Sequence, residues 1–549
     1  MLEMFAAMLR ILATWAVVLG SFWVGLVVIV LVLSLWHLVW PVRWPVQAVV
    51  AAMGGAGLGL AGRDLWAWGR AAVRRRGAVA AAAVVAVLMA NRALGPCTTF
   101  DSGLYHLNAV RWTTEYPIVP GLGNLHGPLA YNNAGLQIAA LLEIGPWCGQ
   151  SSHLANPLYL LVLLFHIILA SSQMVRANAD SPMVRVYWLF LLTPVILMMN
   201  RSWASSHNVE VLVAVVTMVA GGRMFAFLAD PSPPDRRQDF DVLVIGLLLA
   251  LGVCVKLSSL VLAATAGVVV VWVYVTRCRR IARGLGALGW IVGLPMAIFL
   301  VWLGRGVVLS GHILYPLPMG SLPVEWAMPD HLEGEVRQAI VGEALGSIQP
   351  GAVLDWVGRL GREILMPTVI ALAALAVMVR RRARPAIRGP WLLVLAILPA
   401  IAAWAVTAPQ KRFAFFLFWI LAGAIGAMAL AGADLLTSRR CRIAVTIVMM
   451  VGVANITPSK VFYGRGPDGG LHPTPTATMT TYVTAGNLTL YVPVNDTQCW
   501  DSPLPSTPDP RPDLRLRKPG DLASGFVIDP SLASPATQPA ASRQVTSPD

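Results

Sequence analysis

Long apolar runs separated by short polar connections dominate the pattern of this chain. Runs of apolar residues recur from near the N-terminus to about residue 457, and a helix that crosses a bilayer needs about 20 such residues. We therefore predict an all-α polytopic membrane protein with about 13 transmembrane helices. The expected spans are 11–35, 46–62, 78–90, 157–174, 186–200, 209–228, 242–255, 258–275, 284–304, 365–379, 391–408, 413–432 and 443–457.

Composition agrees with a membrane protein. The 549 residues are 57% hydrophobic and 12% charged, with a mean hydropathy of +0.67. A soluble chain of this size does not tolerate such a balance. The net charge of +14 would suggest a nucleic-acid partner in a soluble protein. Here the arginines cluster between apolar runs, so membrane topology explains the charge better and we expect no nucleic acid.

The arginine clusters also predict the orientation of the chain, because Lys and Arg accumulate on the cytoplasmic side. Threading the helices from a cytoplasmic N-terminus to an extracytoplasmic C-terminus places every cluster inside. We interpret the first apolar run as an uncleaved anchor because it lacks a cleavage site. The clustered residues are Arg63, Arg70, Arg74 to Arg76, Arg176, Arg185, Arg236, Arg237, Arg277 to Arg283, Arg380 to Arg388 and Arg439 to Arg442.

The same threading gathers three larger segments on the outer face of a helical domain that we expect over residues 1–457. These are the loops 91–156 and 305–364 and a C-terminal region over 458–529. The second loop contains a possible amphipathic helix near 331–345. The C-terminal region contains alternating runs such as LTLYVPV, which indicate some β-structure. We expect the Ser/Pro/Ala-rich residues 530–549 to be disordered.

The segment from Asp101 to Gly135 is the densest group of polar and turn-forming residues. A helix there should end near Tyr116, because Pro117 disfavours helical geometry in the residue before it. The Pro- and Gly-rich stretch that follows should fold into a compact loop that carries Asn124 and His126. One face of the predicted helix carries Asp101, Tyr105, Asn108, Trp112 and Glu115.

These residues supply the candidate chemistry. Asp101 follows a membrane helix, and a partly desolvated carboxylate there can act as a general base toward a hydroxyl. Equally, Asp101 can simply cap the helix. Glu115 and His126 are the other catalytic candidates. Tyr105, His106, Asn124 and Asn132 are candidate substrate ligands, although a histidine in a polar loop is more often a hydrogen-bonding residue and the asparagines are equally suited to turns.

Three cations are further binding candidates. Lys256 lies between two short apolar runs, Arg305 at the expected outer end of its helix, and Arg412 between two helices at the same face. Together they would hold a lipid phosphate or pyrophosphate. Alternatively, each extends separately to a lipid headgroup. Glu210, in the polar stretch WASSHNVE, begins a helix on that face.

Several classes of function are disfavoured. The sequence contains no glycine-rich nucleotide-binding loop, and acidic residues are nearly absent from the apolar runs, which counts against ATP-driven and proton-coupled transport. The six cysteines show no metal-ligand spacing, so we assign no metal ligands and expect no cofactor. The acidic residues at the outer face could hold one divalent ion, but no ligand spacing indicates it. A disulfide between Cys97 and Cys148 is left open, because sequence does not fix the distance.

The run DSGLYHLNAVRWTTEYPIVPGLGNLHGPLAYNN, with KLSS, LSGHILYPLP, APQKRFAFFLFW and CWDSPLPSTPDP, resembles a family of largely uncharacterised bacterial membrane proteins. That family's expected motifs are DxGLYHL, YPIVPGLGNLHGRL, SGYPLYP, APDxRF and CWxxPLPCTP. The chain departs from them at Pro128 (Arg expected), Gln410 (Asp expected) and Ser506 (Cys expected). The last departure argues against a disulfide at Cys499.

The layout also resembles the GT-C superfamily of glycosyltransferases, which implies that Asp101 is the catalytic base and that a polyprenyl-linked sugar is the donor. We therefore expect a glycosyltransferase of the bacterial inner membrane that transfers sugar to an extracytoplasmic glycan, lipid or protein acceptor. The alternatives are a transporter or flippase for lipid-linked saccharides, a polymerase that uses them, or a non-catalytic envelope assembly protein.

Overall fold

A computed structural model describes most of the chain. The described residues are 2–73, 76–174, 182–199, 201–278, 281–317, 319–345, 352–380, 389–432 and 471–532, with single positions between 436 and 446. The expected span 443–457, the expected domain boundary at 457 and the tail after 532 lie outside these residues, apart from isolated positions.

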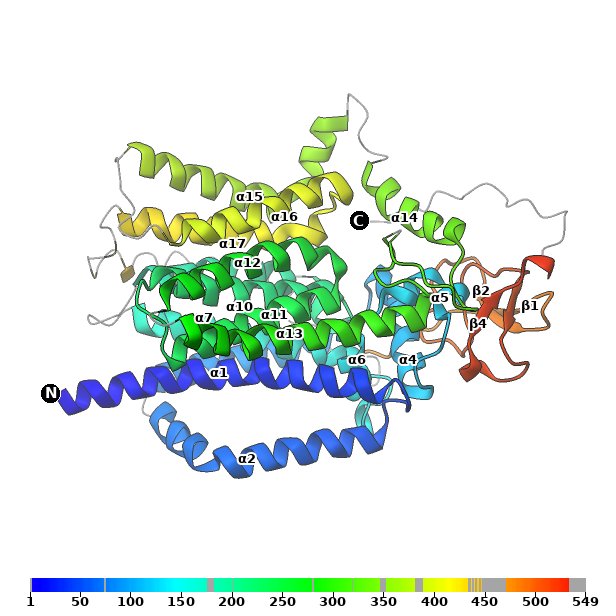
Figure 1. Ribbon diagram of the computed structural model, residues 1–549, viewed down its shortest axis with the longest axis horizontal. Coiled ribbons are helices and arrows are strands. Elements are labelled where there is room, and N and C mark those ends of the chain that lie inside the picture. The colour runs from blue at the N-terminus through cyan, green and yellow to red at the C-terminus, as the bar shows by residue number, and fades with distance from the viewer. Residues whose placement is uncertain are drawn as a thin grey trace.

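The described part of the chain is a bundle of long helices, as the apolar runs predicted (Figure 1). Ten of its helices are long and apolar enough to cross a membrane, and two shorter apolar helices accompany them at Val79–Ala93 and Trp391–Thr407. The helices of the bundle are α1 Leu2–Trp36, α2 Trp44–Val73, α3 Arg76–Ala93, α7 Ala155–Met174, α8 Pro182–Phe190, α9 Leu192–Met199, α10 Val209–Ala229, α11 Arg236–Val255, α12 Leu260–Arg277, α13 Ile281–Ser310, α15 Ala352–Arg380, α16 Trp391–Thr407 and α17 Lys411–Gly432.

Helix α10 is the centre of the bundle. It packs against α7, α8, α11 and α17, and 94% of its apolar membrane-spanning stretch is buried inside the protein. By contrast, only 6% of the apolar membrane-spanning stretch of α2 is buried, and side chains such as Leu60 (90% exposed) project from this helix. An apolar helix with such a surface suits contact with lipid tails.

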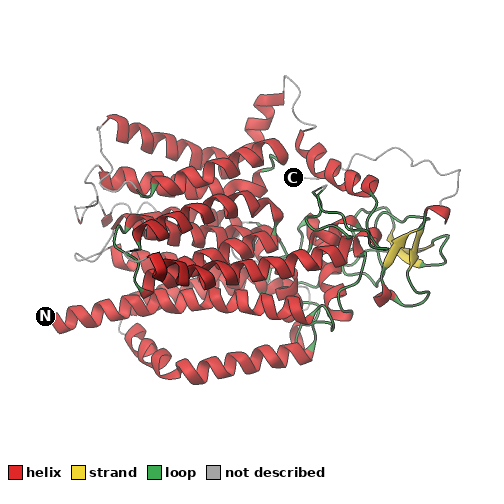
Figure 2. Ribbon diagram, viewed as in Figure 1, coloured by secondary structure: helices red, strands yellow, loops and turns green. Residues whose placement is uncertain are grey.

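The polar segments gather at one end of this bundle, on the right in Figure 1. They include the first large loop and the segment after α13, as the threading predicted. Figure 2 shows that the strands also lie at this end. The elements are α4 Leu107–Glu115, α5 Leu122–Leu125, α6 Ala134–Leu141, α14 Asp330–Leu345, β1 Met479–Val483, β2 Thr489–Pro493, β3 Leu514–Leu516 and β4 Phe526–Ile528.

The C-terminal strands form two antiparallel pairs and pack on the first loop. β1 pairs with β2, so that Met479 lies opposite Pro493, and β3 pairs with β4. The expected strand in LTLYVPV is therefore confirmed. Backbone hydrogen bonds join this region to the loop: Trp500 N–H donates to Gly103 at 2.9 Å, and Phe526 N–H donates to Pro120 at 3.0 Å.

Helix direction determines which residues share an end of the bundle. α10 begins and α11 ends at the polar end, where Glu210 and Lys256 meet at 2.6 Å. The 21 residues of α10 rise about 1.5 Å each, so its C-terminus lies roughly 30 Å away. Arg236 begins α11 and Arg277 ends α12, so these two members of the arginine clusters lie at the opposite end from Lys256.

Candidate functional site

Asp101 begins the polar segment that follows α3. One π-helical turn, Ser102–His106, leads directly into α4, which ends at Glu115 with Tyr116 extended (φ −128°). The predicted end of this helix is therefore confirmed. The Asp101 side chain makes no capping hydrogen bond, so its interpretation as a helix cap is wrong. Instead, it accepts a hydrogen bond from Nη1 of Arg412 at 3.0 Å.

A second ion pair lies beside the first. Nζ of Lys256 donates to Glu210 at 2.6 Å and lies 3.6 Å from the centre of the Phe413 ring. The Arg412 guanidinium lies 4.9 Å from the same ring. We call Asp101, Glu210, Lys256, Arg412 and Phe413 the Asp101 cluster. One of the three expected cations, Arg412, thus pairs with the expected carboxylate, and a second, Lys256, lies beside that pair and is bound to Glu210.

Local structure explains why these groups converge. Lys256 has an extended backbone (φ −151°) and separates α11 from the short turn that begins α12. Arg412 lies in the first turn of α17 and also donates to Gln410 Oε1 at 2.8 Å. Both breaks fall at the polar end of the bundle. Polar side chains from four elements therefore reach one point without interrupting an apolar helix.

Burial shapes the electrostatics of Asp101. Its side chain is 16% exposed, and removal from water raises the pKa of the carboxyl above its ordinary value. The positive charge of Arg412 opposes this rise, while Glu210 adds to it. A raised pKa suits a carboxylate that must take a proton from a hydroxyl, because it brings the group closer to working pH.

His106 adjoins Tyr105 beside the cluster, with ring centres 4.3 Å apart. It is fully buried, and neither ring nitrogen has a hydrogen-bond partner among the described residues. Burial lowers its pKa to about 3, so the ring is neutral near pH 7. It can offer a substrate one donor and one acceptor, but no charge.

A crevice of about 10 Å³ adjoins Arg412. Arg201 and Lys411 add two cations to its lining, and Arg201 is ion-paired with Glu363 of α15. Its other lining residues are Leu197, Met198, Trp203 and Phe415. Cations thus meet an apolar wall from α9 and α17 at the edge of the Asp101 cluster.

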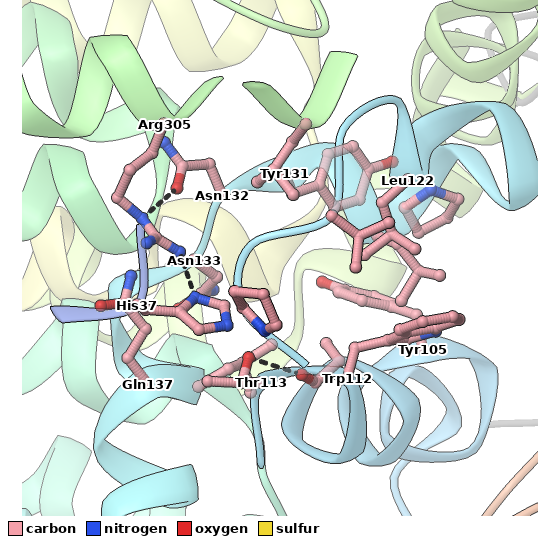
Figure 3. Close-up of a pocket in the computed structure, with 17 residues that line it drawn as sticks. His37, Tyr105, Trp112, Thr113, Leu122, Tyr131, Asn132, Asn133, Gln137 and Arg305 are labelled. Atoms are coloured by element: carbon pink, nitrogen blue, oxygen red, sulfur yellow. Dashed lines mark hydrogen bonds between the residues drawn. The ribbon is translucent and has the colours of Figure 1, made fainter. Parts of the chain in front are cut away.

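Arg305 lies elsewhere, which corrects the expectation that it shares the site. α13 continues to Ser310, so Arg305 lies inside the helix and is 3% exposed. It donates to Asn132 Oδ1 at 3.3 Å, Ser34 O at 3.2 Å and His37 Nδ1 at 3.1 Å. Figure 3 shows the contacts with Asn132 and His37 beside a separate cavity, with Tyr105 and Tyr131 across from Arg305.

The other two catalytic candidates have local roles. Glu115 forms an ion pair with Arg111 one helical turn away at 2.7 Å. His126 is buried, its Nε2 has no hydrogen-bond partner among the described residues, and burial lowers its pKa to about 4. Neither side chain contacts the Asp101 cluster among the described residues, so their catalytic role stays a prediction.

The two candidate asparagines fit the alternative interpretation as turn residues. Asn124 donates to the backbone oxygens of Trp326 at 3.0 Å and Phe526 at 3.1 Å. Asn132 adopts a left-handed conformation (φ 51°) and donates to Trp302 O at 2.6 Å. Asn124 therefore joins the first loop to the second loop and to the C-terminal strands.

Sequence reasoning missed several residues of the site. Glu210 was visible as a polar residue at a helix start, but its pairing with Lys256 was not. Lys411 directly precedes Arg412 in QKRF, which was an available signal. No pattern marked Arg201 or Tyr131.

The cysteines and the candidate metal ligands give no site. Cys97, Cys148 and Cys499 are unbridged, and Ser506, at the position where the resemblance led us to expect cysteine, donates to Asn108 at 3.0 Å. The described part of the chain holds no group of three or more His, Cys, Asp or Glu side chains arranged for a metal ion.

Comparisons with known proteins give two matches. A family model described as a domain of unknown function, DUF8201, matches residues 4–419. Among solved structures, the arabinosyltransferase EmbB from Mycobacterium smegmatis is similar, with a TM-score of 0.38 and 15% identity. That match covers 64% of this chain and 30% of EmbB. No curated protein matches the sequence.

Proposed function

We propose that this chain, which belongs to the DUF8201 family, is a membrane glycosyltransferase. It transfers a sugar from a polyprenyl-phosphate donor to a hydroxyl group of an extracytoplasmic glycan, lipid or protein acceptor. The observation that carries this proposal is the contact of Asp101 with Arg412, beside the pair formed by Lys256 and Glu210. A base and phosphate-binding cations at one point are what such a transfer requires.

The reaction follows from these groups. Asp101 takes the proton of the acceptor hydroxyl, and the acceptor oxygen bonds to the anomeric carbon of the sugar. The bond from that carbon to the donor phosphate breaks, and the phosphate leaves with the electron pair. Arg412 and Lys256 stabilise the charge that grows on the phosphate oxygens. In the resting protein Arg412 pairs with Asp101; when it turns to the phosphate, the carboxylate becomes free to act as the base.

The crevice beside Arg412 supports a lipid-linked donor. Lys411 brings further positive charge to the phosphate. Arg201 is paired with Glu363, which also lines the crevice, but its guanidinium can still bind phosphate oxygens in a bidentate manner. Leu197, Met198 and Phe415 form an apolar wall in the same crevice. Its volume admits about one water molecule, so the first part of a polyprenyl chain would lie against this wall once Arg412 turns away and widens the crevice. A water-soluble sugar nucleotide would gain nothing from that wall.

The alternative of a transporter or flippase would need a polar path along the bundle axis. From Val211 to Val219 the side chains of α10 are buried and, apart from Thr217, apolar. This segment fills the centre of the bundle directly beneath Glu210. The packing therefore favours chemistry at the polar end over passage through the bundle.

Replacement of Asp101 by Asn tests the proposal. The variant keeps the shape of the side chain and removes the base, so we expect sugar incorporation into surface glycan to fall by a factor of about 100 to 10,000. The assay compares cells that lack the gene and carry either version, at matched protein levels in the membrane.

The matched control is Asp496→Asn, because Asp496 is exposed at the same end of the molecule. This substitution should leave sugar incorporation unchanged. Near-normal incorporation by a well-expressed Asp101→Asn protein would remove Asp101 from the mechanism.

A further inference from the structure

A cavity beside Arg305 has the composition of an anion site. It measures about 40 Å³, and none of the 17 residues drawn around it is acidic (Figure 3). Arg305 supplies the one full charge in this lining, and no carboxylate among the described residues pairs with it. A buried cation without a counter-charge is costly, so the cavity favours an anionic occupant.

The contacts of Arg305 leave part of its guanidinium available. Five N–H groups are present, and three donate to Asn132, Ser34 and His37. Nδ1 of His37 accepts from Arg305, and Nε2 of the same ring contacts the oxygen of Tyr116 at 3.1 Å. His37 is therefore the neutral tautomer with its proton on Nε2, and it adds no charge to the cavity.

A second residue that lines the same cavity carries a donor without a partner. Trp112 is 2% exposed, and its Nε1–H has no acceptor among the described residues. An unpaired buried N–H costs about 1–3 kcal/mol, and an oxyanion in the cavity would satisfy it. The donor and the uncompensated charge are separate observations that indicate the same kind of ligand.

The volume of the cavity limits the size of the anion that it can hold. A water molecule needs about 10–15 Å³ of such volume, so the cavity has room for about three waters. That space suits a phosphoryl group with its three terminal oxygens. The remaining lining includes apolar side chains such as Leu122, Leu129 and Leu309, which suit the organic part of a phosphate ester better than a hydrated ion.

We infer that this cavity is a phosphoryl-binding site, distinct from the Asp101 cluster, in which Arg305 and Trp112 hold the phosphate oxygens. Tyr105 lines the cavity and follows Asp101 on the same turn, so a phosphorylated molecule held here lies next to the cluster. The inference does not depend on glycosyl transfer, because it concerns binding alone.

The test measures thermal unfolding of the full-length protein in detergent while sodium phosphate replaces sodium chloride at constant ionic strength. We expect a saturable rise in Tm with phosphate. Trp112→Phe should weaken the apparent affinity by about tenfold, the usual effect of one lost hydrogen bond to a charged group. Arg305→Gln should abolish the response. Arg43→Gln is the matched control, because Arg43 is exposed at the same end and should leave the response unchanged.

A second arm identifies the source of the phosphoryl group. The protein is reconstituted in phosphatidylcholine vesicles with or without phosphatidic acid, and unfolding is measured again. Stabilisation by phosphatidic acid that Trp112→Phe reduces would assign the site to a lipid headgroup, whereas a response to inorganic phosphate alone would assign it to a soluble phosphate.

The inference is overturned if neither probe raises the Tm of the wild-type protein, or if chloride stabilises as well as phosphate does. An undiminished response in Trp112→Phe also overturns it, and this variant decides the outcome if Arg305→Gln fails to fold.

Discussion

Asp101 and Arg412 are 311 positions apart in the chain, yet their side chains meet at 3.0 Å. The sequence marks both residues, since each is charged and adjoins an apolar run. It marks Arg305 in the same way, and there the prediction of a shared site was wrong. The segment GVVLS after Arg305 is apolar enough to extend the helix. Arg305 therefore lies within the helix instead of at its end, is buried, and donates a hydrogen bond to Asn132. Sequence identifies polar residues near a membrane surface, but tertiary packing selects which of them meet.

The first prediction at this scale concerns the pH dependence of transfer. Asp101 acts as a base when deprotonated, so activity rises as pH rises through its pKa, which burial raises above the ordinary carboxyl value. The positive charge of Lys256 lowers that pKa. Lys256→Gln removes this charge, and we expect the acidic limb of the pH–rate profile to move to higher pH as the maximal rate falls.

Lys518→Gln provides the comparison, since Lys518 is exposed in the C-terminal region; its profile should overlie that of the wild type. An acidic limb that stays in place in Lys256→Gln would separate Lys256 from the titration of Asp101.

At the scale of elements, the loop between α4 and α6 shows what sequence patterns can and cannot give. The glycines and prolines of PIVPGLGNLHGP correctly predicted a compact turn. They could not predict its partners. Gly121 N–H donates to Val308 of α13 at 2.9 Å, and Asn124 binds an oxygen 402 residues away, that of Phe526. Such contacts depend on the packing of the C-terminal strands, which no local pattern encodes.

Gly121→Ala should destabilise the protein strongly. Gly121 has φ +64°, and an added Cβ would lie 2.3 Å from the Phe526 oxygen, so strain of about 1–3 kcal/mol in the backbone adds to a clash with the strand. We expect a lower Tm in detergent and faster proteolysis of the C-terminal region.

Gly145→Ala separates the two effects. Gly145 also has a positive φ (+54°), but open space surrounds its Cβ position, so only the backbone cost applies. If both variants lower Tm equally, close packing of the loop against the strands contributes nothing to stability.

At the scale of the molecule, the threading of apolar runs predicted the gathering of the two large loops and the C-terminal region at one end of the bundle. Arg517 of the C-terminal region forms an ion pair with Glu325 of the second loop at 3.0 Å. Arg111 of the first loop forms an ion pair with Asp501 of the same C-terminal region at 3.3 Å. The expected count of about 13 spans is not confirmed. Ten helices of the described chain are long and apolar enough to cross a membrane, whereas the expected spans 78–90 and 391–408 correspond to shorter apolar helices. The expected span 443–457 lies outside the described residues, apart from isolated positions.

The orientation of the molecule gives the last prediction. Arg236 and Arg277 lie at the end opposite Lys256, and arginine accumulates on the cytoplasmic side, so the end that holds Asp101 should face outward. Cys148 is exposed in the loop before α7, at the Asp101 end. A membrane-impermeant maleimide should therefore label it in intact cells, and Cys148→Ser should remove that label.

Ser232, exposed between α10 and α11 at the other end, tests the cytoplasmic side. In a Cys148→Ser background, Ser232→Cys should react only after the membrane is permeabilised. The reverse pattern would place Asp101 on the cytoplasmic side and exclude an extracytoplasmic acceptor.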